Sequence, residues 1–422
     1  MSRIVKPLAN PEILDSERNR RLSRLQARRK LWLEVHLWLG LGLGLFMAVI
    51  GLTGSVLVFW HEIDEALNPG LYRASIPLKA IRKPLDEILA AVERVTSPGW
   101  ESSWVDAPGD AGMNYVFGFY YPQQTPTPAP EKAVSLNVAV NPYTAEVVDR
   151  RVFYHAWNPL RHCFIGFFFK LHYALLLMDF GVILVGAMAV PLIISVLTGL
   201  ILWWPLDGKW RRVLTIKRRA SAVRFNHDLH QTSGFYTLIV LLALLISGLY
   251  FNLPEQFRWM VERFSPLTPE PVASTDPAPG APSINLDAAL ARSEYPGGVP
   301  QFYSFSPGDR GLFTACYRDV PELRPYVLDS RCLVLDRRNG ELLQVRDPAH
   351  GSGGDVFMQW QWPLHSGKVF GWPGRILVFL TGLACPVLYV TGVIRWLQKR
   401  RAQRQKSGVG HKRVSDHEKY FP

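Results

Sequence analysis

Four histidines stand at the ends of apolar segments, where an imidazole can serve as a metal ligand. They are His36, His172, His230 and His365. Ionisable side chains in membrane helices are costly, and they usually mark a path for ions, protons or electrons, or a cofactor. Two neutral imidazoles that face each other across a helix bundle can supply both axial bonds to a haem iron. The sequence therefore predicts bis-histidine haem.

The pairing of these histidines follows from a match between the two halves of the chain. His36 begins HLWLG and His230 begins HQTSG, so both share H-x-x-x-G at the start of an apolar segment. His172 in KLHYALLL and His365 in PLHSGKVFG both precede the next apolar segment of their half. Repeats in the same orientation are related by an axis along the membrane normal, which brings equivalent residues together. We expect His36 to face His230 on the cytoplasmic side and His172 to face His365 on the outer side.

Other histidines are secondary candidates. His227 lies three residues before His230 on the same helix face, so it could replace or orient that residue. His61 ends the first apolar segment, whereas His155 and His162 precede the second. For any single histidine, hydrogen bonding at the membrane interface is the alternative role.

Small residues follow His36 at steps of three or four, namely Gly40, Gly44, Ala48 and Gly51. On a helix this spacing makes one smooth stripe beside the histidine. A flat macrocycle could lie against the stripe, or the stripe could simply allow another helix to pack closely. The sequence leaves both interpretations open.

Four runs without Asp, Glu, Lys or Arg are long enough to cross a bilayer at about 1.5 Å per residue. They are residues 35–60, 180–205, 231–254 and 376–394. Basic residues gather before the first run, between the second and third, and after the last, as the positive-inside rule requires. We expect an inner-membrane protein with four transmembrane helices and both termini in the cytoplasm.

The chain then alternates membrane and soluble segments. We expect a cytoplasmic basic tail (1–30), a first transmembrane helix (31–60), a periplasmic domain (61–160), an interfacial segment with the second transmembrane helix (161–205), a cytoplasmic basic loop (206–228), a third transmembrane helix (229–253), a second periplasmic domain (254–362), an interfacial segment with the fourth transmembrane helix (363–398) and a cytoplasmic tail (399–422). Both halves have the order helix, outer domain, helix, which defines two parallel internal repeats.

Each outer domain shows a helix followed by strands. In the first, KPLDEILAAVERV has helical periodicity and AVSLNVAVNPYTAEVVDRR has the alternation of a strand followed by a turn. In the second, SINLDAALARS predicts a helix, and RCLVLDRRNGELLQVRD predicts two strands that reverse at Arg-Asn-Gly. Both domains are therefore expected to be α+β.

Charge and cysteine content exclude several kinds of site. The net charge is +12, but 22 of the 47 basic residues flank the apolar runs, so no nucleic-acid partner is expected. The four cysteines lack C-x-x-C and C-x-x-C-H spacings, so neither a zinc site nor covalent haem is indicated. Cys316 and Cys332 lie in strand-like runs outside the cytoplasm, where they either form a disulfide or remain two buried thiols. P-loop, nucleophile-elbow and H-E-x-x-H motifs are absent from the sequence.

The segments around the histidines carry a family resemblance. They are HLWLGLGLG with GLTGSVLVF, KLHYALLL with LTGLILWWP, HDLHQTSGFY, and PLHSGKVFGWPGR with VTGVIRW. With them the chain resembles the PepSY-associated transmembrane family, also called PiuB-like membrane proteins, which includes inner-membrane ferric-siderophore reductases. The turns AVNPYTAEVV and VLDRRNGELL are similar to those that close PepSY modules.

The resemblance implies two haem b groups, held by His36 with His230 and by His172 with His365. It also implies an oxidoreductase that passes electrons across the inner membrane to a periplasmic ferric siderophore and releases Fe(II). The expected partners are membrane lipid, the ferric siderophore, and an electron donor that is either a quinol or a cytoplasmic reductase.

Two alternatives need no haem. The first is a membrane-anchored PepSY regulatory or binding protein that acts on a periplasmic partner. The second is a metal or proton transporter, which is less favoured because the spans lack the carboxylates of proton relays. An absorption spectrum distinguishes them from the reductase, since only the reductase predicts a reducible Soret band.

Overall fold

The computed structural model describes residues 11–96, 101–120, 134–155, 164–206, 208–217, 219–272, 285–292, 298–305, 311–324 and 326–418. Contacts divide the chain into two compact units. The first unit comprises Met1–Leu52, Ala187–Ile246 and Leu380–Pro422, and the second unit comprises Thr53–Gly186 and Ser247–Phe379.

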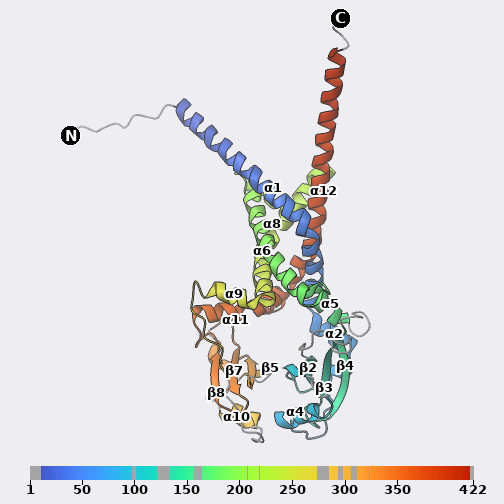
Figure 1. Ribbon diagram of the computed structural model, residues 1–422, viewed down its shortest axis with the longest axis vertical. Coiled ribbons are helices and arrows are strands. Elements are labelled where there is room, and N and C mark those ends of the chain that lie inside the picture. Colours follow the sequence, from blue (N-terminus) through green and yellow to red (C-terminus); the bar gives the residue numbers. More distant parts are fainter. Residues whose placement is uncertain are drawn as a thin grey trace, which may run out of the picture. The chain divides into compact units, whose positions relative to one another are not determined.

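Four long helices carry the apolar runs (Figure 1). They are α1 (Pro11–Leu57), α6 (Met178–Trp203), α8 (Ala222–Asn252) and α12 (Gly371–Glu418). Within the described residues, four stretches are long and apolar enough to cross a membrane: Ala27–Leu57, Met178–Trp203, Ala222–Asn252 and Lys368–Gln405. Their large apolar side chains are mostly exposed, as at Leu45, Ile183 and Ile239. This composition suits a lipid environment, because a helix satisfies its own backbone hydrogen bonds there.

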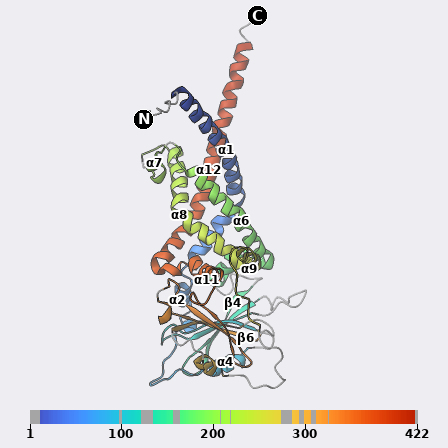
Figure 2. The same ribbon diagram turned by 90° about the vertical axis from the view of Figure 1, so that its left-hand side faces the viewer.

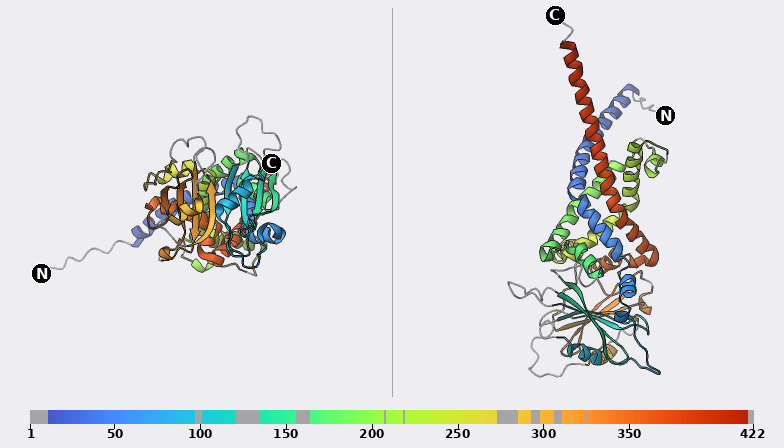
Figure 3. Two further views of the ribbon diagram at one scale, coloured as in Figure 1. Left: turned by 90° about the horizontal axis from the view of Figure 1, so that it is seen from below. Right: turned by 90° about the vertical axis from the view of Figure 1, so that its right-hand side faces the viewer.

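The second unit contains one eight-stranded antiparallel sheet in the order β4-β3-β2-β1-β5-β6-β7-β8. Its strands are β1 (Glu101–Asp106), β2 (Tyr115–Tyr120), β3 (Val134–Val140), β4 (Val147–His155), β5 (Val299–Phe305), β6 (Leu312–Arg318), β7 (Arg331–Asp336) and β8 (Leu342–Arg346). The two soluble segments of the chain meet where β1 pairs with β5, and Figure 3 shows their blue-green and orange strands edge to edge. The strand-turn-strand predictions for β3–β4 and β7–β8 are confirmed.

One face of the sheet is covered by α4 (Leu85–Glu93) and α10 (Leu286–Arg292), one helix from each segment (Figure 1). Both helices lie where the sequence predicts them. Asp287 Oδ2 accepts a hydrogen bond from Leu85 N at 2.5 Å, and Asp86 Oδ2 accepts one from Leu286 N at 3.0 Å. Each helix thus supplies a carboxylate that accepts a hydrogen bond from a backbone N–H at the start of the other helix, where such groups have no partner within their own helix.

Helices α5 (Phe164–Ala174), α9 (Pro254–Val261) and α11 (Gly353–Ser366) also belong to the second unit, and α9 and α11 lie across the sheet from α4 in Figure 2. Helix α11 begins with a capping box formed by Ser352 and Asp355. It ends at Gly367, whose φ of 73° lies in the left-handed region that glycine adopts readily. A Cβ at Gly367 would lie 2.7 Å from the backbone of Gly374, so the turn into η3 (Lys368–Phe370) and α12 needs a glycine.

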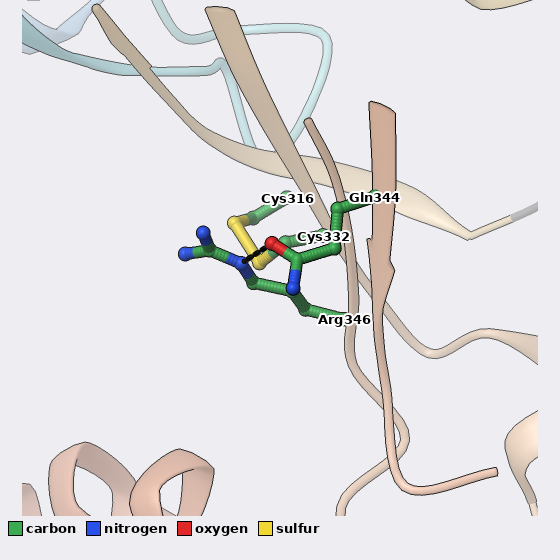
Figure 4. The surroundings of a disulfide bond; sticks show 4 residues. All are labelled: Cys316, Cys332, Gln344 and Arg346. Atoms are coloured by element: carbon green, nitrogen blue, oxygen red, sulfur yellow. Dashed lines mark hydrogen bonds between the residues drawn. A yellow bond between two sulfur atoms is a disulfide. The ribbon is translucent and has the colours of Figure 1, made fainter. Parts of the chain in front are cut away.

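Cys316 and Cys332 form a disulfide between directly paired residues of β6 and β7. This resolves the choice left open by the sequence in favour of the disulfide. In Figure 4 the side chains of Gln344 and Arg346 lie beside it, and Arg346 Nε donates a hydrogen bond to Gln344 Oε1 at 2.8 Å. Cys385 is a free, buried thiol.

Candidate metal centres

The first histidine pair lies in the first unit. His36 on α1 and His230 on α8 have ring centroids 6.2 Å apart, and their ring planes make an angle of 76°. Both side chains are partly buried. The structure therefore brings together two histidines that are nearly two hundred residues apart in sequence, as the match between the halves predicts.

The second histidine pair lies in the second unit. His172 on α5 and His365 on α11 have ring centroids 6.0 Å apart at an interplanar angle of 68°. The end of α5 is held in place by Asn252, whose amide donates hydrogen bonds to Tyr173 O at 2.8 Å and to Val182 O at 2.9 Å. His172 thus lies on a short helix whose connection to α6 is fixed by a third helix.

The spacing of both pairs suits a single metal ion between two imidazoles. A metal–imidazole bond is about 2.0–2.1 Å long, so two such bonds in line place the ring centroids roughly 6.3 Å apart. The observed separations are 6.2 Å and 6.0 Å. Edge-to-face contacts between rings span about 4.5–7 Å between centroids, so the distance is read together with the groups that orient each ring. The donor set therefore fits a bis-histidine haem at each pair.

Hydrogen bonds at Nδ1 fix the orientation of all four rings. The partner atoms are Ser195 O for His36 at 2.8 Å, Thr391 Oγ1 for His230 at 2.9 Å, Thr53 Oγ1 for His172 at 3.1 Å and Ser247 Oγ for His365 at 2.8 Å. Thr198 Oγ1 also lies 3.4 Å from His36 Nδ1. Metal-binding histidines characteristically engage their second ring nitrogen in this way, which sets the tautomer and directs the other nitrogen at the metal.

A glycine makes room for each ring. A Cβ at Gly54 would lie 2.9 Å from His172 Cε1, and one at Gly199 would lie 3.1 Å from His36 Cε1. The corresponding distances are 3.5 Å from Gly392 to His230 and 3.7 Å from Gly248 to His365. The first two approaches leave no space for a larger residue unless the imidazole shifts.

The hydroxyl and the glycine that serve each histidine are neighbours in sequence. The dipeptides are Thr53-Gly54, Thr198-Gly199, Ser247-Gly248 and Thr391-Gly392. Each of the four long helices carries one of them, and each contacts one histidine on another helix. In the sequence, these segments indicate only how the two halves align. The recurrence of hydroxyl-glycine in all four apolar runs was the signal that could have found these contacts.

A cavity of about 1590 Å³ lies in the second unit, on the face of the sheet opposite α4 and α10. Its walls come from the sheet, from α5 and from the α11–η3 segment. Lining residues flank both members of the second pair in sequence, with Lys170 and Tyr173 around His172, and Pro363 and Lys368 around His365. The disulfide also contributes to the wall. The volume exceeds that of typical small-molecule pockets, so a bulky ligand can enter.

Two titratable groups in this cavity have shifted pKa values. Burial raises the pKa of Asp106, on β1, to about 7, although the charge of Lys368 acts in the opposite direction. Burial lowers the pKa of His61 to about 4, and Lys368 adds to that shift. At neutral pH His61 is therefore uncharged, whereas Asp106 is divided between its acid and carboxylate forms.

Comparison with known protein families decides the relationship of this chain. The family described as PepSY-associated TM region matches residues 33–399. The chain belongs to this family. A comparison with curated proteins finds no match. All four histidines and all four hydroxyl-glycine dipeptides of this PepSY-associated protein lie within the matched range.

The remaining candidate histidines of the PepSY-associated protein take other positions. His227 is 39% exposed and lies 3.4 Å from Asp228, beside the first pair rather than in it. His61 lines the cavity of the second unit, stacked on Trp60. His155 pairs with Val134 in the sheet. His162 lies outside the described residues.

The small-residue stripe after His36 serves two purposes. A Cβ at Gly44 would lie 2.6 Å from the ring of Tyr389, and one at Gly51 would lie 2.6 Å from Cys385, so these glycines let α12 approach α1. A Cβ at Gly40 meets nothing within 4 Å in the described structure. Helix packing therefore explains the C-terminal part of the stripe, at Gly44 and Gly51, whereas space remains next to Gly40, one turn after His36.

Proposed function

We propose that this chain is a haem-containing reductase of the bacterial inner membrane, which passes electrons to a periplasmic ferric siderophore and releases Fe(II). The observation that carries the proposal is the presence of two facing imidazole pairs, with ring centroids 6.2 Å and 6.0 Å apart. Both distances would suit one iron ion held between two imidazole nitrogens. One such pair could be a chance contact, but two with the same supporting groups are difficult to attribute to chance.

Haem b bound at both pairs would supply reversible one-electron chemistry on each side of the membrane. The protein's part is to hold and orient the four histidines. At the first pair, Thr391 Oγ1 donates to Val387 O, so its lone pairs accept from His230 Nδ1–H. This arrangement selects the tautomer whose Nε2 lone pair is available to a metal.

The basic clusters give the direction of electron transfer. We place residues 18–30, 209–224 and 395–413 in the cytoplasm, because lysine and arginine are concentrated on that side of inner-membrane proteins. The first pair then lies toward the cytoplasm, near a quinol or a cytoplasmic donor. The second pair and the sheet lie toward the periplasm.

Two parallel internal repeats account for the symmetry of the contacts. In the first half, α6 supplies Thr198-Gly199 to His36, and α1 supplies Thr53-Gly54 to His172. In the second half, α12 and α8 supply the equivalent dipeptides to His230 and His365. A repeat that conserves the helper groups as well as the ligands supports equivalent chemistry at both pairs.

The cavity of the second unit is the proposed substrate site. It has room for a ferric chelate, and its lining includes residues within three positions of His172 and His365 in the sequence. Trp60, Trp104 and Trp362 offer apolar surface for the organic part of a siderophore. Once reduced, iron is held less strongly by hard oxygen ligands and can leave.

The proposal is tested with detergent-purified, full-length protein. We expect a Soret band that shifts on reduction with dithionite, and reoxidation of that spectrum when a ferric siderophore is added. His36→Ala and His172→Ala should each remove part of the band, whereas the matched variant His155→Ala should keep it.

The alternatives give different results. A protein that folds and inserts but shows no Soret band after expression with ample haem would favour the PepSY regulatory or binding protein. If the protein shows the Soret band but ferric siderophores do not reoxidise its haem, haem binding stands and the siderophore is rejected as the substrate.

A further inference from the structure

Asp106 occupies an unusual position in the sheet of the second unit. It ends β1, the strand that joins the two soluble segments by pairing with both β2 and β5. Its neighbour Val105 faces the core under α4 and α10. Because side chains alternate along a strand, Asp106 faces the opposite way and lines the cavity.

The carboxyl group of Asp106 lacks the partners that a structural aspartate has. Its Oδ2 atom is buried and has no hydrogen-bond partner in the described part of the chain. Two other buried carboxylates of this unit show the contrast: Asp64 pairs with Arg151, and Asp347 pairs with Arg331 at 2.7 Å. A buried polar atom without a partner costs free energy, so its presence in a cavity points to a ligand.

The charged and titratable groups around the cavity do not neutralise Asp106. Lys368 on η3 is the cation that acts on it, but no ion pair to Asp106 forms among the described residues. Tyr72 on α3 (Pro69–Tyr72) donates its hydroxyl to Asp64 at 2.6 Å, and Arg318 on β6 pairs with Asp319. His61 on α2 (Trp60–Leu67) is uncharged at neutral pH, because burial lowers its pKa to about 4. Asp106 therefore titrates near neutrality, with a pKa of about 7.

We propose that Asp106 is the acid that protonates an iron-binding oxygen of the siderophore as the iron is released. This role rests on the proposed reductase function. It requires only that the chelate enter the cavity whose wall Asp106 forms. The chemical class of substrate is a hydroxamate or catecholate chelate, whose anionic oxygens are more basic than a carboxylate.

Chelated Fe(III) takes one electron, which the proposed reductase function supplies, and becomes Fe(II). An Fe–O bond then breaks with both electrons remaining on oxygen, and this oxygen takes the proton of the Asp106 carboxyl group. Fe(II) leaves, and the Asp106 carboxylate takes up one proton from the buffered solvent, so one electron and one proton are consumed for each Fe–O bond that is broken in this way. Proton transfer blocks rebinding, because a protonated oxygen is a poor iron ligand.

Stopped-flow measurement separates electron transfer from release. Reduced, haem-loaded, full-length protein is mixed with ferrioxamine B, a ferric hydroxamate, in the presence of a chromogenic Fe(II) chelator. Haem reoxidation reports the electron, and the coloured Fe(II) complex reports release. In the native protein we expect release to slow as the pH rises through about 7, where Asp106 loses its proton.

Below pH 7, Asp106→Asn should release Fe(II) at least about tenfold more slowly than the native protein. The release rate of this variant should no longer change as the pH passes through about 7. The rate of the first haem reoxidation should be unchanged. Asp106→Glu should restore the pH dependence. The matched control is Asp149→Asn, which removes a carboxylate of β4 that does not line the cavity. The control should leave the pH profile unchanged.

Each outcome has one meaning. If Asp106→Asn keeps the native release rate and pH profile while haem is reoxidised, the role of Asp106 is wrong and the reductase function stands. If ferrioxamine B reoxidises neither protein, the reductase function and the role of Asp106 fall together.

Infrared spectroscopy tests the acid without turnover. In the oxidised native protein, a protonated-carboxyl C=O band should disappear as the pH rises through about 7. This band should be missing from Asp106→Asn and present in Asp149→Asn. The same band in the spectrum of Asp106→Asn would overturn the assignment.

Discussion

At the scale of single residues, the histidines are distinguished by what surrounds them. An interfacial histidine in a hydrogen-bonding role would need only one polar partner. Here each ring has a hydrogen-bonded Nδ1, a glycine against its edge and a second imidazole at about the distance that a shared metal requires. The combination argues for a metal ligand, because each feature serves the placement of Nε2.

The hydroxyl of Thr391 should tune the first pair. Thr391→Val keeps the shape of the side chain but removes the oxygen that lies 2.9 Å from His230 Nδ1. We expect haem affinity at this pair to fall by about 10- to 100-fold, as for other groups that orient a ligand. Titration of the apoprotein with haem measures this affinity. Thr381→Val, at an equally buried threonine of α12, is the control, and an equal loss there would contradict the specific role.

The glycine beside His172 should be irreplaceable. In Gly54→Ala the new methyl group would lie 2.9 Å from His172 Cε1, so the ring must shift and its Nε2 must move off the metal axis. We expect loss of the second haem and retention of the first, measured by the haem-to-protein ratio. Gly42→Ala on the same helix adds a methyl group that meets nothing within 4 Å and should keep both haems. Full haem content in Gly54→Ala would reject this steric account.

At the scale of elements, short helices position His172 and His365, and strand pairing positions Asp106. The sequence could predict the long helices, α4, α10 and the β3–β4 and β7–β8 reversals, because periodicity and turn residues are local signals. It could not predict that β1 pairs with β5, since pairing between distant strands leaves no local pattern. The positions of α5 and α11 likewise depend on distant contacts such as that of Asn252 with Tyr173.

The disulfide should stabilise the second unit rather than take part in iron reduction. It joins β6 to β7 across a separation of 16 residues. A loop of this length corresponds to about 3 kcal/mol of unfolding free energy. We expect the double variant Cys316→Ser and Cys332→Ser to unfold at lower temperature while keeping its haem spectrum. Loss of ferric reduction at a temperature where the variant is folded would show a redox role instead.

At the scale of the whole molecule, the halves of the chain carry the same set of contacts. The pairing of His36 with His230 and of His172 with His365 could be predicted, because the two halves align around H-x-x-x-G and the following helices. The cavity and Asp106 could not, since the cavity needs both soluble segments in one sheet and Asp106 has no motif around it. That the pairs bind haem stays a prediction.

The proposed membrane topology rests on the placement of basic residues. We expect alkaline phosphatase to be active when fused within residues 61–160, and a fluorescent protein to be fluorescent at the C-terminus, because the positive-inside rule places these regions in the periplasm and the cytoplasm. Activity and fluorescence of fusions in bacterial cells measure this. The reverse pattern would invert the proposed direction of electron flow.

Electron paramagnetic resonance of the oxidised, purified protein tests the central claim most directly. Imidazole planes at 76° and 68° to one another predict two low-spin ferric signals of the strongly anisotropic kind that nearly perpendicular axial imidazoles produce. His36→Ala should remove one signal and His172→Ala the other. A spectrum without low-spin ferric haem, or one that both variants leave intact, would contradict the assignment of these two histidine pairs as haem ligands.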